Sequence, residues 1–526
     1  MENKKHIFVY LSLTLIAFLC FFSYGNSLNG KFIWDDNFMI VNNNFIKNWQ
    51  GITKILTKDI GYGVGQKVGF FRPLQLLTYM MDYSIWKLNP IGYHLTNIFL
   101  HILVGYAVFW LLNILYKNIF ISLAASLFFI VCPAGVEAVA YIAGRADILA
   151  TLFILLSFIF YLKYIYSHKI NFYIIMLIAF IFALLSRENS LVFPLLLLSY
   201  HWIFKKRLDF KSIAPFVLVI ALYSMSRIFF IQVYPVKTTT TLFQRIPGFF
   251  YALCNYINLL IFPHDLHMEY GMKLFHFSNP IAITGIVLLS VSIAIIFMVK
   301  ETNKIIAFSL TWFIVGFLPM SNLYPINAYM AEHWLYLPSI GFFSVLAYLA
   351  YLLFKKNKIV SVILVLSLTY FYSVLTIKQN NYWQEPISFF KRTLHYAPDS
   401  YNVYINMAVA YTDLGQTKEA IAAYKQAIEI APKKAKAYSN LGGLYAKIGN
   451  NQEAERFIKK AIELDPNYIS AYLNLATIYM NTGKIEEAIT AYKQVAKIEP
   501  GNAKAYYSLG EISKNGGSVW NRGAGH

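Results

Sequence analysis

Residues 435–468, AKAYSNLGGLYAKIGNNQEAERFIKKAIELDPNY, decide the fold of the C-terminal part of the chain. Their landmarks return every 34 residues. The recurring positions are prolines at Pro398, Pro432, Pro466 and Pro500 and tyrosines at Tyr404, Tyr438 and Tyr472. Self-similarity at a fixed period of about 20 to 50 residues is typical of stacked repeats. This part is therefore predicted to be an α-helical solenoid.

A 34-residue period with an aromatic near its start and a proline near its end is that of the tetratricopeptide (TPR) repeat, a pair of helices. Full repeats are expected at 401–434, 435–468 and 469–502, with a half-repeat at 385–397 and a fourth starting at Ala503. The array is thus assigned to 385–513. Small residues at Ala420, Ala454 and Ala488 suit the tight contact within each pair. Residues 514–526 abandon the pattern and are expected to form an irregular tail.

The rest of the chain has the composition of a membrane protein. Of its 526 residues 58% are hydrophobic and 13% are charged, whereas soluble domains carry about 25% charged residues. The net charge of +19 does not indicate nucleic acid, because many lysines lie in short loops between apolar runs. The three cysteines, at positions 20, 132 and 254, include no CxxC pair and predict neither a disulfide framework nor a zinc site.

Residues 1–380 are predicted to form an all-α, multi-span bundle. Apolar segments fall at 7–24, 95–115, 119–134, 147–166, 172–186, 189–204, 212–233, 248–263, 280–299, 304–320, 334–354 and 359–377. With a cytoplasmic N-terminus and a segment 248–263 that does not cross, nearly every short basic loop falls inside, as the positive-inside rule requires. This gives eleven spans. It places the long first loop, 25–93, and the TPR array on the extracytoplasmic side.

Asp35 and Asp36 follow Trp34 in this first loop. An aromatic at the membrane interface lowers the local dielectric, which raises a carboxylate pKa and suits it to act as a general base. A solvated turn is the alternative, because Asp-Asp-Asn is good turn chemistry. Arg72 follows in the stretch FFRPL. His94, Asn97 and His101 then share one polar helical face, interpreted as a structural hydrogen-bond seam or as part of a site.

Glu137, Tyr141 and Arg145 would share a helical face at steps of four residues. Arg145 could then bind a phosphate with its planar guanidinium, or it could pair internally with Glu137 or Asp147. Further ionisable candidates on the same predicted face are Arg187, Glu188, Glu332 and His333.

The order of these motifs resembles a known family. WDD at 34–36, FRPL, HLTNIFLH, PAGVEAVAYIAGRADILA and AEHWLYLPSIGF, followed by 34-residue repeats, are similar to the transmembrane and TPR-containing O-mannosyltransferases. The resemblance covers roughly residues 7–510, and EAVAYIAGRADILA is its most specific motif. Cys132 precedes Pro133 where the family usually has histidine, so a role for that histidine is absent here.

The resemblance implies a GT-C membrane fold and an inverting glycosyltransferase. It also implies that the site residues lie in the outer loops. A sugar, mannose or another hexose, would pass from a polyprenyl-phosphate donor to Ser or Thr hydroxyls of extracytoplasmic proteins. Asp35 or Asp36 matches the first-loop catalytic base, and the second-loop ionisable residues correspond to Glu137, Arg145 and Asp147. The lysine and asparagine content suggests a bacterial member in the inner membrane, with a periplasmic array.

In this scheme the catalytic carboxylates are Asp35, Asp36 and Glu137. The donor phosphate would be bound by Arg72, Arg145 and Arg187. Supporting roles fall to His94, Asp147, Glu188, Glu332 and His333. No cofactor beyond the donor is certain. A divalent metal stays open as an alternative but is not indicated, since the chain shows no DxD motif or histidine ligand set that demands one.

Asparagines recur at one position of three successive repeats, Asn406, Asn440 and Asn474. An amide can both donate to and accept from an extended acceptor peptide, although asparagine is common at this position in TPRs. Two alternatives to a protein acceptor stay open. The enzyme could act on a lipid-linked glycan or cell-wall polymer, or the protein could be a non-catalytic membrane scaffold that recruits partners through its repeats.

Overall fold

The computed structural model describes residues 2–65, 68–208, 210–231, 240–271, 273–326 and 328–523. The chain divides into two compact units, Met1–Phe389 and Phe390–His526. Throughout the described ranges the regular structure is helical, with no β-strand. The predicted all-α class is thereby confirmed.

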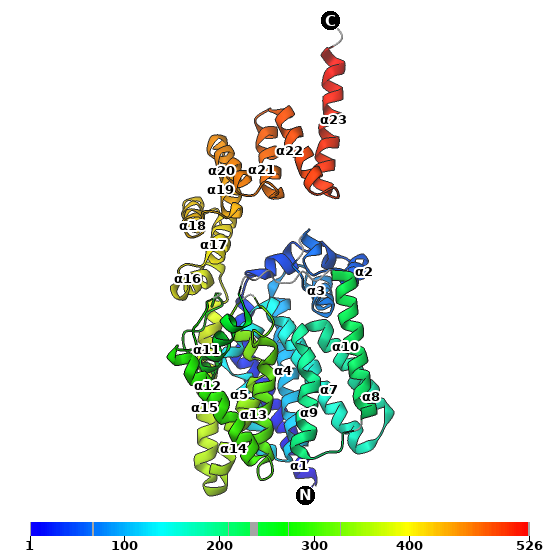
Figure 1. The fold of residues 1–526 in the computed structure, drawn as a ribbon, viewed down its shortest axis with the longest axis vertical. Helices are drawn as coiled ribbons and strands as arrows, with labels where there is room; N and C mark the ends of the chain where they lie inside the picture. Colours follow the sequence, from blue (N-terminus) through cyan, green and yellow to red (C-terminus); the bar gives the residue numbers. More distant parts are fainter. Residues whose placement is uncertain are drawn as a thin grey trace. The chain divides into compact units, whose positions relative to one another are not determined.

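The first unit is a bundle of long helices (Figure 1), and each predicted apolar segment corresponds to one of them. They are α1 (Glu2–Tyr24), α4 (Pro90–Tyr116), α5 (Ile119–Ile130), α7 (Arg145–Ser167), α8 (Ile170–Ser186), α9 (Phe193–Phe204), α10 (Phe210–Ile231), α11 (Leu242–Ile261), α12 (Pro280–Val299), α13 (Lys304–Phe317), α14 (Ser339–Lys356) and α15 (Lys358–Tyr382).

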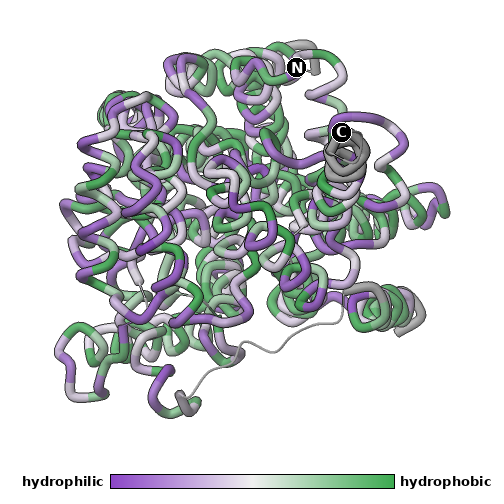
Figure 2. The backbone as a smooth tube through the Cα atoms, turned by 90° about the horizontal axis from the view of Figure 1, so that it is seen from above, coloured by the Kyte–Doolittle hydropathy of each residue, from purple (hydrophilic) through white to green (hydrophobic). Residues whose placement is uncertain are grey.

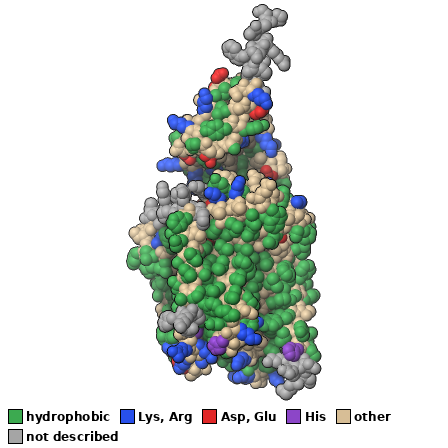
Figure 3. All heavy atoms as spheres, turned by 90° about the vertical axis from the view of Figure 1, so that its right-hand side faces the viewer, with side chains coloured by type: hydrophobic (Ala, Val, Ile, Leu, Met, Phe, Trp, Pro, Cys, Tyr) green, Lys and Arg blue, Asp and Glu red, His purple; other side chains and the backbone are tan. Residues whose placement is uncertain are grey.

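Among the residues that the structure describes, six helices are long and apolar enough to cross a membrane, and a seventh span results if the bent pair Ile119–Ile130 and Pro133–Val139 is one crossing. Shorter apolar helices occupy Ile170–Ser186, Ile213–Phe229 and Lys304–Met320. On the face of the bundle shown in Figure 3, the surface is almost continuously hydrophobic, and Lys, Arg and His side chains gather at its lower end. This surface suits lipid contact, and the count of eleven spans stays a prediction.

Local chemistry explains where the helices begin. Asn118, Asn303 and Asn357 each accept a hydrogen bond from a backbone N–H in the first turn of the helix that follows. These asparagine caps satisfy N–H groups that have no partner within the helix. The two-residue link between α4 and α5 turns through Lys117, at φ 52°.

The first loop contains the short helix α2 (Ile52–Thr57) and the 14-residue helix α3 (Pro73–Trp86). Asp59 organises the segment before α3, because its carboxylate accepts hydrogen bonds from four backbone N–H groups. These belong to Gly61, Val68, Gly69 and Phe70. A carboxylate saturated in this way fixes the backbone that leads to Arg72.

The second unit has the predicted repeats. After α16 (Pro386–Tyr396), helices pair as α17 (Tyr401–Asp413) with α18 (Thr417–Ile430), α19 (Ala435–Lys447) with α20 (Asn451–Leu464), and α21 (Ile469–Asn481) with α22 (Ile485–Ile498). The turn within each pair uses a glycine with φ between 72° and 82°, at Gly415, Gly449 and Gly483, because L side chains rarely adopt this conformation. The alanines expected at the contacts are fully buried.

Helix α23 (Ala503–Gly523) begins the fourth repeat. Its backbone is helical as far as Gly523, so the irregular tail predicted for 514–526 is wrong over most of its length.

Viewed from above, hydrophilic and hydrophobic residues mix along the helices of the molecule (Figure 2).

Candidate active site

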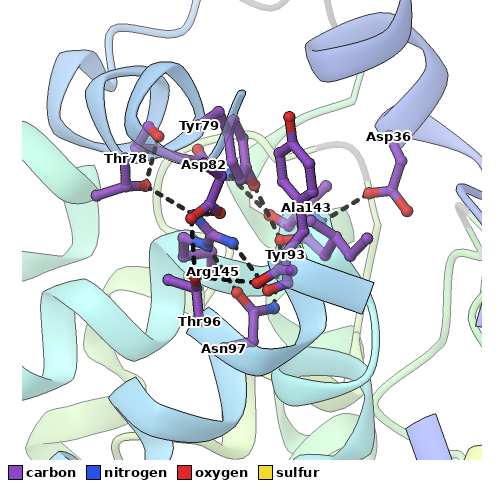
Figure 4. A network of polar contacts seen from close by, with 12 residues as sticks. Asp36, Thr78, Tyr79, Asp82, Tyr93, Thr96, Asn97, Ala143 and Arg145 are labelled. Carbon is purple, nitrogen blue, oxygen red and sulfur yellow. Dashed lines mark hydrogen bonds and ion pairs between the residues drawn. The ribbon is translucent and has the colours of Figure 1, made fainter. Parts of the chain in front are cut away.

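Asp36 is a structural carboxylate. It is fully buried, and its two oxygens accept hydrogen bonds from the backbone N–H groups of Ile33 at 3.0 Å and Ala143 at 2.8 Å. Figure 4 shows Asp36 reaching Ala143 from the first loop. These bonds tie the first loop to the turn that precedes α7. With both oxygens engaged, Asp36 is poorly placed to accept a proton from a substrate.

Asp35 differs from Asp36 in its exposure and in its hydrogen bonds. Its side chain is exposed to solvent, and its backbone N–H donates to the Tyr141 hydroxyl at 3.0 Å. Protein atoms packed around the carboxyl restrict its hydration and raise its pKa above the usual 3.8. A hydrogen bond from Tyr141 and the charges of Arg72 and His333 act in the opposite direction. Of the two aspartates left open by the sequence, Asp35 has the accessible, tuned carboxylate that general-base chemistry needs.

Arg145 lies in a closed polar network at the junction of α3, α4 and α7 (Figure 4). Its fully buried guanidinium pairs with Asp82 at 2.6 Å. It also donates to the Asn97 side chain at 2.6 Å and the Tyr93 carbonyl at 3.0 Å, and it stacks over Tyr79. All three guanidinium nitrogens are engaged within the protein, so the phosphate-binding role predicted for Arg145 disagrees with its geometry.

Asp82 is the partner that the sequence interpretation missed. It is the single charged residue of α3, in the run PLQLLTYMMDYSIW. A lone charge inside an apolar helix of a membrane protein faces the protein interior and needs a partner. This pattern is the feature of the sequence that points to Asp82. Glu137 and Asp147 were the internal partners considered for Arg145. They pair instead with His333 and Arg187.

Two other arginines keep donors available. Arg72 binds Glu188 through Nε at 3.2 Å, and Arg187 binds Asp147 through Nη1. Each pair uses one nitrogen of a guanidinium that carries five N–H groups, and both arginines remain slightly exposed. Arg227 reaches Glu188 at 4.0 Å. The cluster thus offers cationic groups that an anionic ligand can approach.

Glu137 and His333 form a second pair. The buried Glu137 accepts from His333 Nδ1 at 2.6 Å and from the His333 backbone N–H at 2.9 Å. Both carboxylate oxygens are therefore used to orient one imidazole. A small cavity beside this ring is lined by Asp147, Thr151, Asn189, Ser190, His333 and Trp334, with apolar residues from α7 and the α13 end. Glu137 is a positioning residue here, and the catalytic role predicted for it is not supported by its contacts.

The remaining supporting candidates serve the scaffold. The buried Glu332 accepts from the Tyr270 hydroxyl at 2.8 Å and from the His267 backbone N–H, which fixes the loop before α12. His94 is buried on α4 against Gly30. Asn97 and His101 are buried on the same face and hydrogen-bonded within the protein, so the polar face of this helix points into the bundle.

The structure gathers most of the predicted residues. Asp35 interacts electrostatically with Arg72 and His333, and Asp147 interacts with Arg187, His333 and Arg72. These groups come from the first loop, α7, the α8–α9 link and the turn before α14. Within the part of the chain that the structure describes, no three His, Cys, Asp or Glu side chains are grouped to hold a metal ion.

The three array asparagines are half-buried. Asn474 donates to the Ser439 hydroxyl and carbonyl of the preceding repeat, and Asn440 contacts Tyr424. Some of these asparagines therefore stabilise the stacking of repeats. Asn406 is the one with the fewest such contacts.

Comparison with known proteins supports both units. Models described as TPR repeat and tetratricopeptide repeat match residues 397–449 and 449–512. The relatives are protein O-mannosyl-transferases. The chain is 27% identical to F38B6.6 of Caenorhabditis elegans over 80% of this chain and 62% of that protein, and 25% identical to TMTC3 of Homo sapiens over 78% and 54%.

A shorter match to human TMTC1 is 37% identical over 143 residues, 26% of this chain and 16% of that protein. The chain therefore spans less than two thirds of these curated relatives. The crystal structure of MamA is 30% identical over 25% of this chain and 77% of its own, with a TM-score of 0.23. The resemblance stated from the motifs is confirmed by the relatives.

The two arginine environments predict opposite mutant behaviour. Arg145→Met leaves Asp82 buried without its partner and should destabilise the protein by about 3 to 5 kcal/mol, whereas Arg187→Met should give normally folded protein. Thermal midpoints and yields of monodisperse protein in detergent measure the difference. If the Arg145→Met protein is stable but inactive, Arg145 has its role in the ligand site and not in the fold.

Proposed function

We propose that this protein is a membrane glycosyltransferase that moves a sugar from a polyprenyl-phosphate donor to Ser or Thr hydroxyls of proteins outside the cytoplasm. The observation that carries the proposal is the exposed Asp35 carboxylate in one cluster with Arg72 and Arg187. The names of the relatives support mannose as the sugar. The inner membrane, with a cytoplasmic N-terminus and a periplasmic array, is the proposed location.

Asp35 acts as the general base in this mechanism. It removes the proton of the acceptor hydroxyl as that oxygen attacks the anomeric carbon of the donor sugar. A new C–O bond forms while the bond between the anomeric carbon and the phosphate oxygen breaks. The polyprenyl phosphate leaves with the electron pair, and a single displacement inverts the anomeric centre.

Negative charge grows on the phosphate during this step, so preorganised cations stabilise the transition state. Arg72 and Arg187 supply free guanidinium N–H groups, and Arg227 completes a cationic set around Glu188. Because Glu137 engages Nδ1 of His333, the Nε2 atom is the one that remains to contact the donor. Asp147 and Glu188 hold the arginines in place.

Replacement of the base tests the proposal directly. Asp35→Asn should lower transfer to a Ser/Thr peptide by about 10²- to 10⁴-fold, the usual contribution of general-base catalysis, and leave folding intact. Asp36→Asn should instead lower the amount of folded protein, because it disturbs the bonds to Ile33 and Ala143. Glycopeptide mass analysis with purified, reconstituted protein measures transfer. Full activity of Asp35→Asn would refute the assignment.

The pH dependence follows from the environment of Asp35. A base is active only when deprotonated, and the pKa of Asp35 is raised above 3.8, so kcat/KM should fall as pH decreases through a midpoint above that value. Tyr141→Phe removes a hydrogen bond that lowers this pKa and should move the midpoint to still higher pH. The profile is measured with saturating donor. A shift to lower pH in Tyr141→Phe would contradict this placement.

The repeats are proposed to hold an extended acceptor polypeptide. The double change Asn406→Ala and Asn440→Ala should raise the KM for long acceptors several-fold and leave short peptides unaffected, because only a long chain can contact several repeats at once. Asn474→Ala is the comparison for stacking, since its amide binds Ser439. If long protein acceptors are unaffected while a lipid-linked glycan is modified, the acceptor is a glycan or cell-wall polymer instead.

A further inference from the structure

The segment that leads into the repeats is bonded along its length to the segment that carries Asp35. The Lys31 backbone N–H donates to the Gln384 carbonyl at 2.9 Å, and Lys31 Nζ pairs with Glu385 at 2.9 Å. Both contacts join residues that are more than 350 positions apart. They fix the first loop against the end of α15 and the start of α16.

Side-chain amides extend this connection. Asn380 Nδ2 donates to the Ser23 carbonyl and to Asn26 Oδ1, both at 2.8 Å. Asn26 in turn donates to Asn381, and Gln384 donates to the Asn26 carbonyl at 2.9 Å. A network with this many directional bonds holds one relative position of the two segments.

Aromatic contacts continue from this network to the base. Phe389, on α16, meets the Trp34 ring edge-on at 6.2 Å between centroids and the Trp383 ring at 4.7 Å. Trp383 packs on Tyr141 at 5.4 Å, and the Tyr141 hydroxyl binds the Asp35 backbone. Asp35 is thus held from two sides, through Trp34 before it in the chain and through Tyr141 beside it.

The backbone conformation of Trp34 requires surrounding contacts of this kind. Trp34 has φ 49°, in the left-handed region, which bulky residues adopt only when surrounding contacts impose it. This turn directs the next residue, Asp35, to the surface while Asp36 enters the interior. The side chain of Trp34 needs a rigid partner, and Phe389 supplies one.

We infer that Phe389, on the helix that leads into the TPR array, is a positioning residue for the proposed base Asp35. It acts through Trp34 and through Trp383 and Tyr141, and the inference rests on the proposed function. Phe389 lies near the start of α16 (Pro386–Tyr396) and belongs to the same compact unit as Asp35.

The test uses the full-length protein in liposomes, with a polyprenyl-phosphate mannose donor and a short Ser/Thr peptide acceptor. Phe389→Ala should lower kcat by about tenfold or more, since small misplacement of a catalytic group has large effects, with donor KM changed by less than about twofold. The groups facing Asp35 are Tyr141, Arg72, His333 and Asp36. Loosening Tyr141 should move the acid limb of the profile to higher pH, as in Tyr141→Phe.

Phe389→Tyr keeps the ring and should restore both kcat and the pH profile, whereas Phe389→Leu should not. Tyr492→Ala, which removes a buried aromatic from α22, controls for general loss of array stability and should leave the profile unchanged. Wild-type kcat and profile in Phe389→Ala, or equal behaviour of Phe389→Ala and Tyr492→Ala, would overturn the inference. Retained activity in Asp35→Asn would instead refute the proposed function.

Discussion

The buried ion pair between Arg145 and Asp82 is the contact on which the rest of the membrane unit depends. It joins α3, α4 and α7 at one point, and Asn97, Tyr93 and Thr78 complete the coordination of the guanidinium. A charge in this setting is tolerated only when every donor is satisfied. The turn before α7 is thereby fixed, and Ala143 in that turn is where Asp36 attaches the first loop.

In the candidate site, residues of the same type have different roles. Of two adjacent aspartates, one is buried as a connector and the other is exposed as a candidate base. Of three arginines considered for phosphate, one stabilises the fold and two keep donors for an anion. Burial and the number of satisfied hydrogen bonds separate these roles, and both are properties of the three-dimensional environment.

Periodicity and hydropathy predicted the architecture well, because repeats and apolar runs are local in the sequence. The 34-residue spacing located each helix pair, and each apolar segment became a helix. The site was predicted less completely. The sequence placed Asp35, Arg72, Arg187 and His333 on one predicted face, but the choice between Asp35 and Asp36, and the pairing of Arg145 with Asp82, depend on contacts between distant segments. The tail after Lys514 was misjudged because a glycine-rich ending argued against a helix.

The glycine turns at Gly415, Gly449 and Gly483 make the array modular. Each helix pair packs chiefly on its neighbours, as in other solenoids. Repeats can therefore be gained or lost during evolution without changing how the remaining pairs pack. The length of the array and the residues of the first unit are therefore properties that selection can adjust separately.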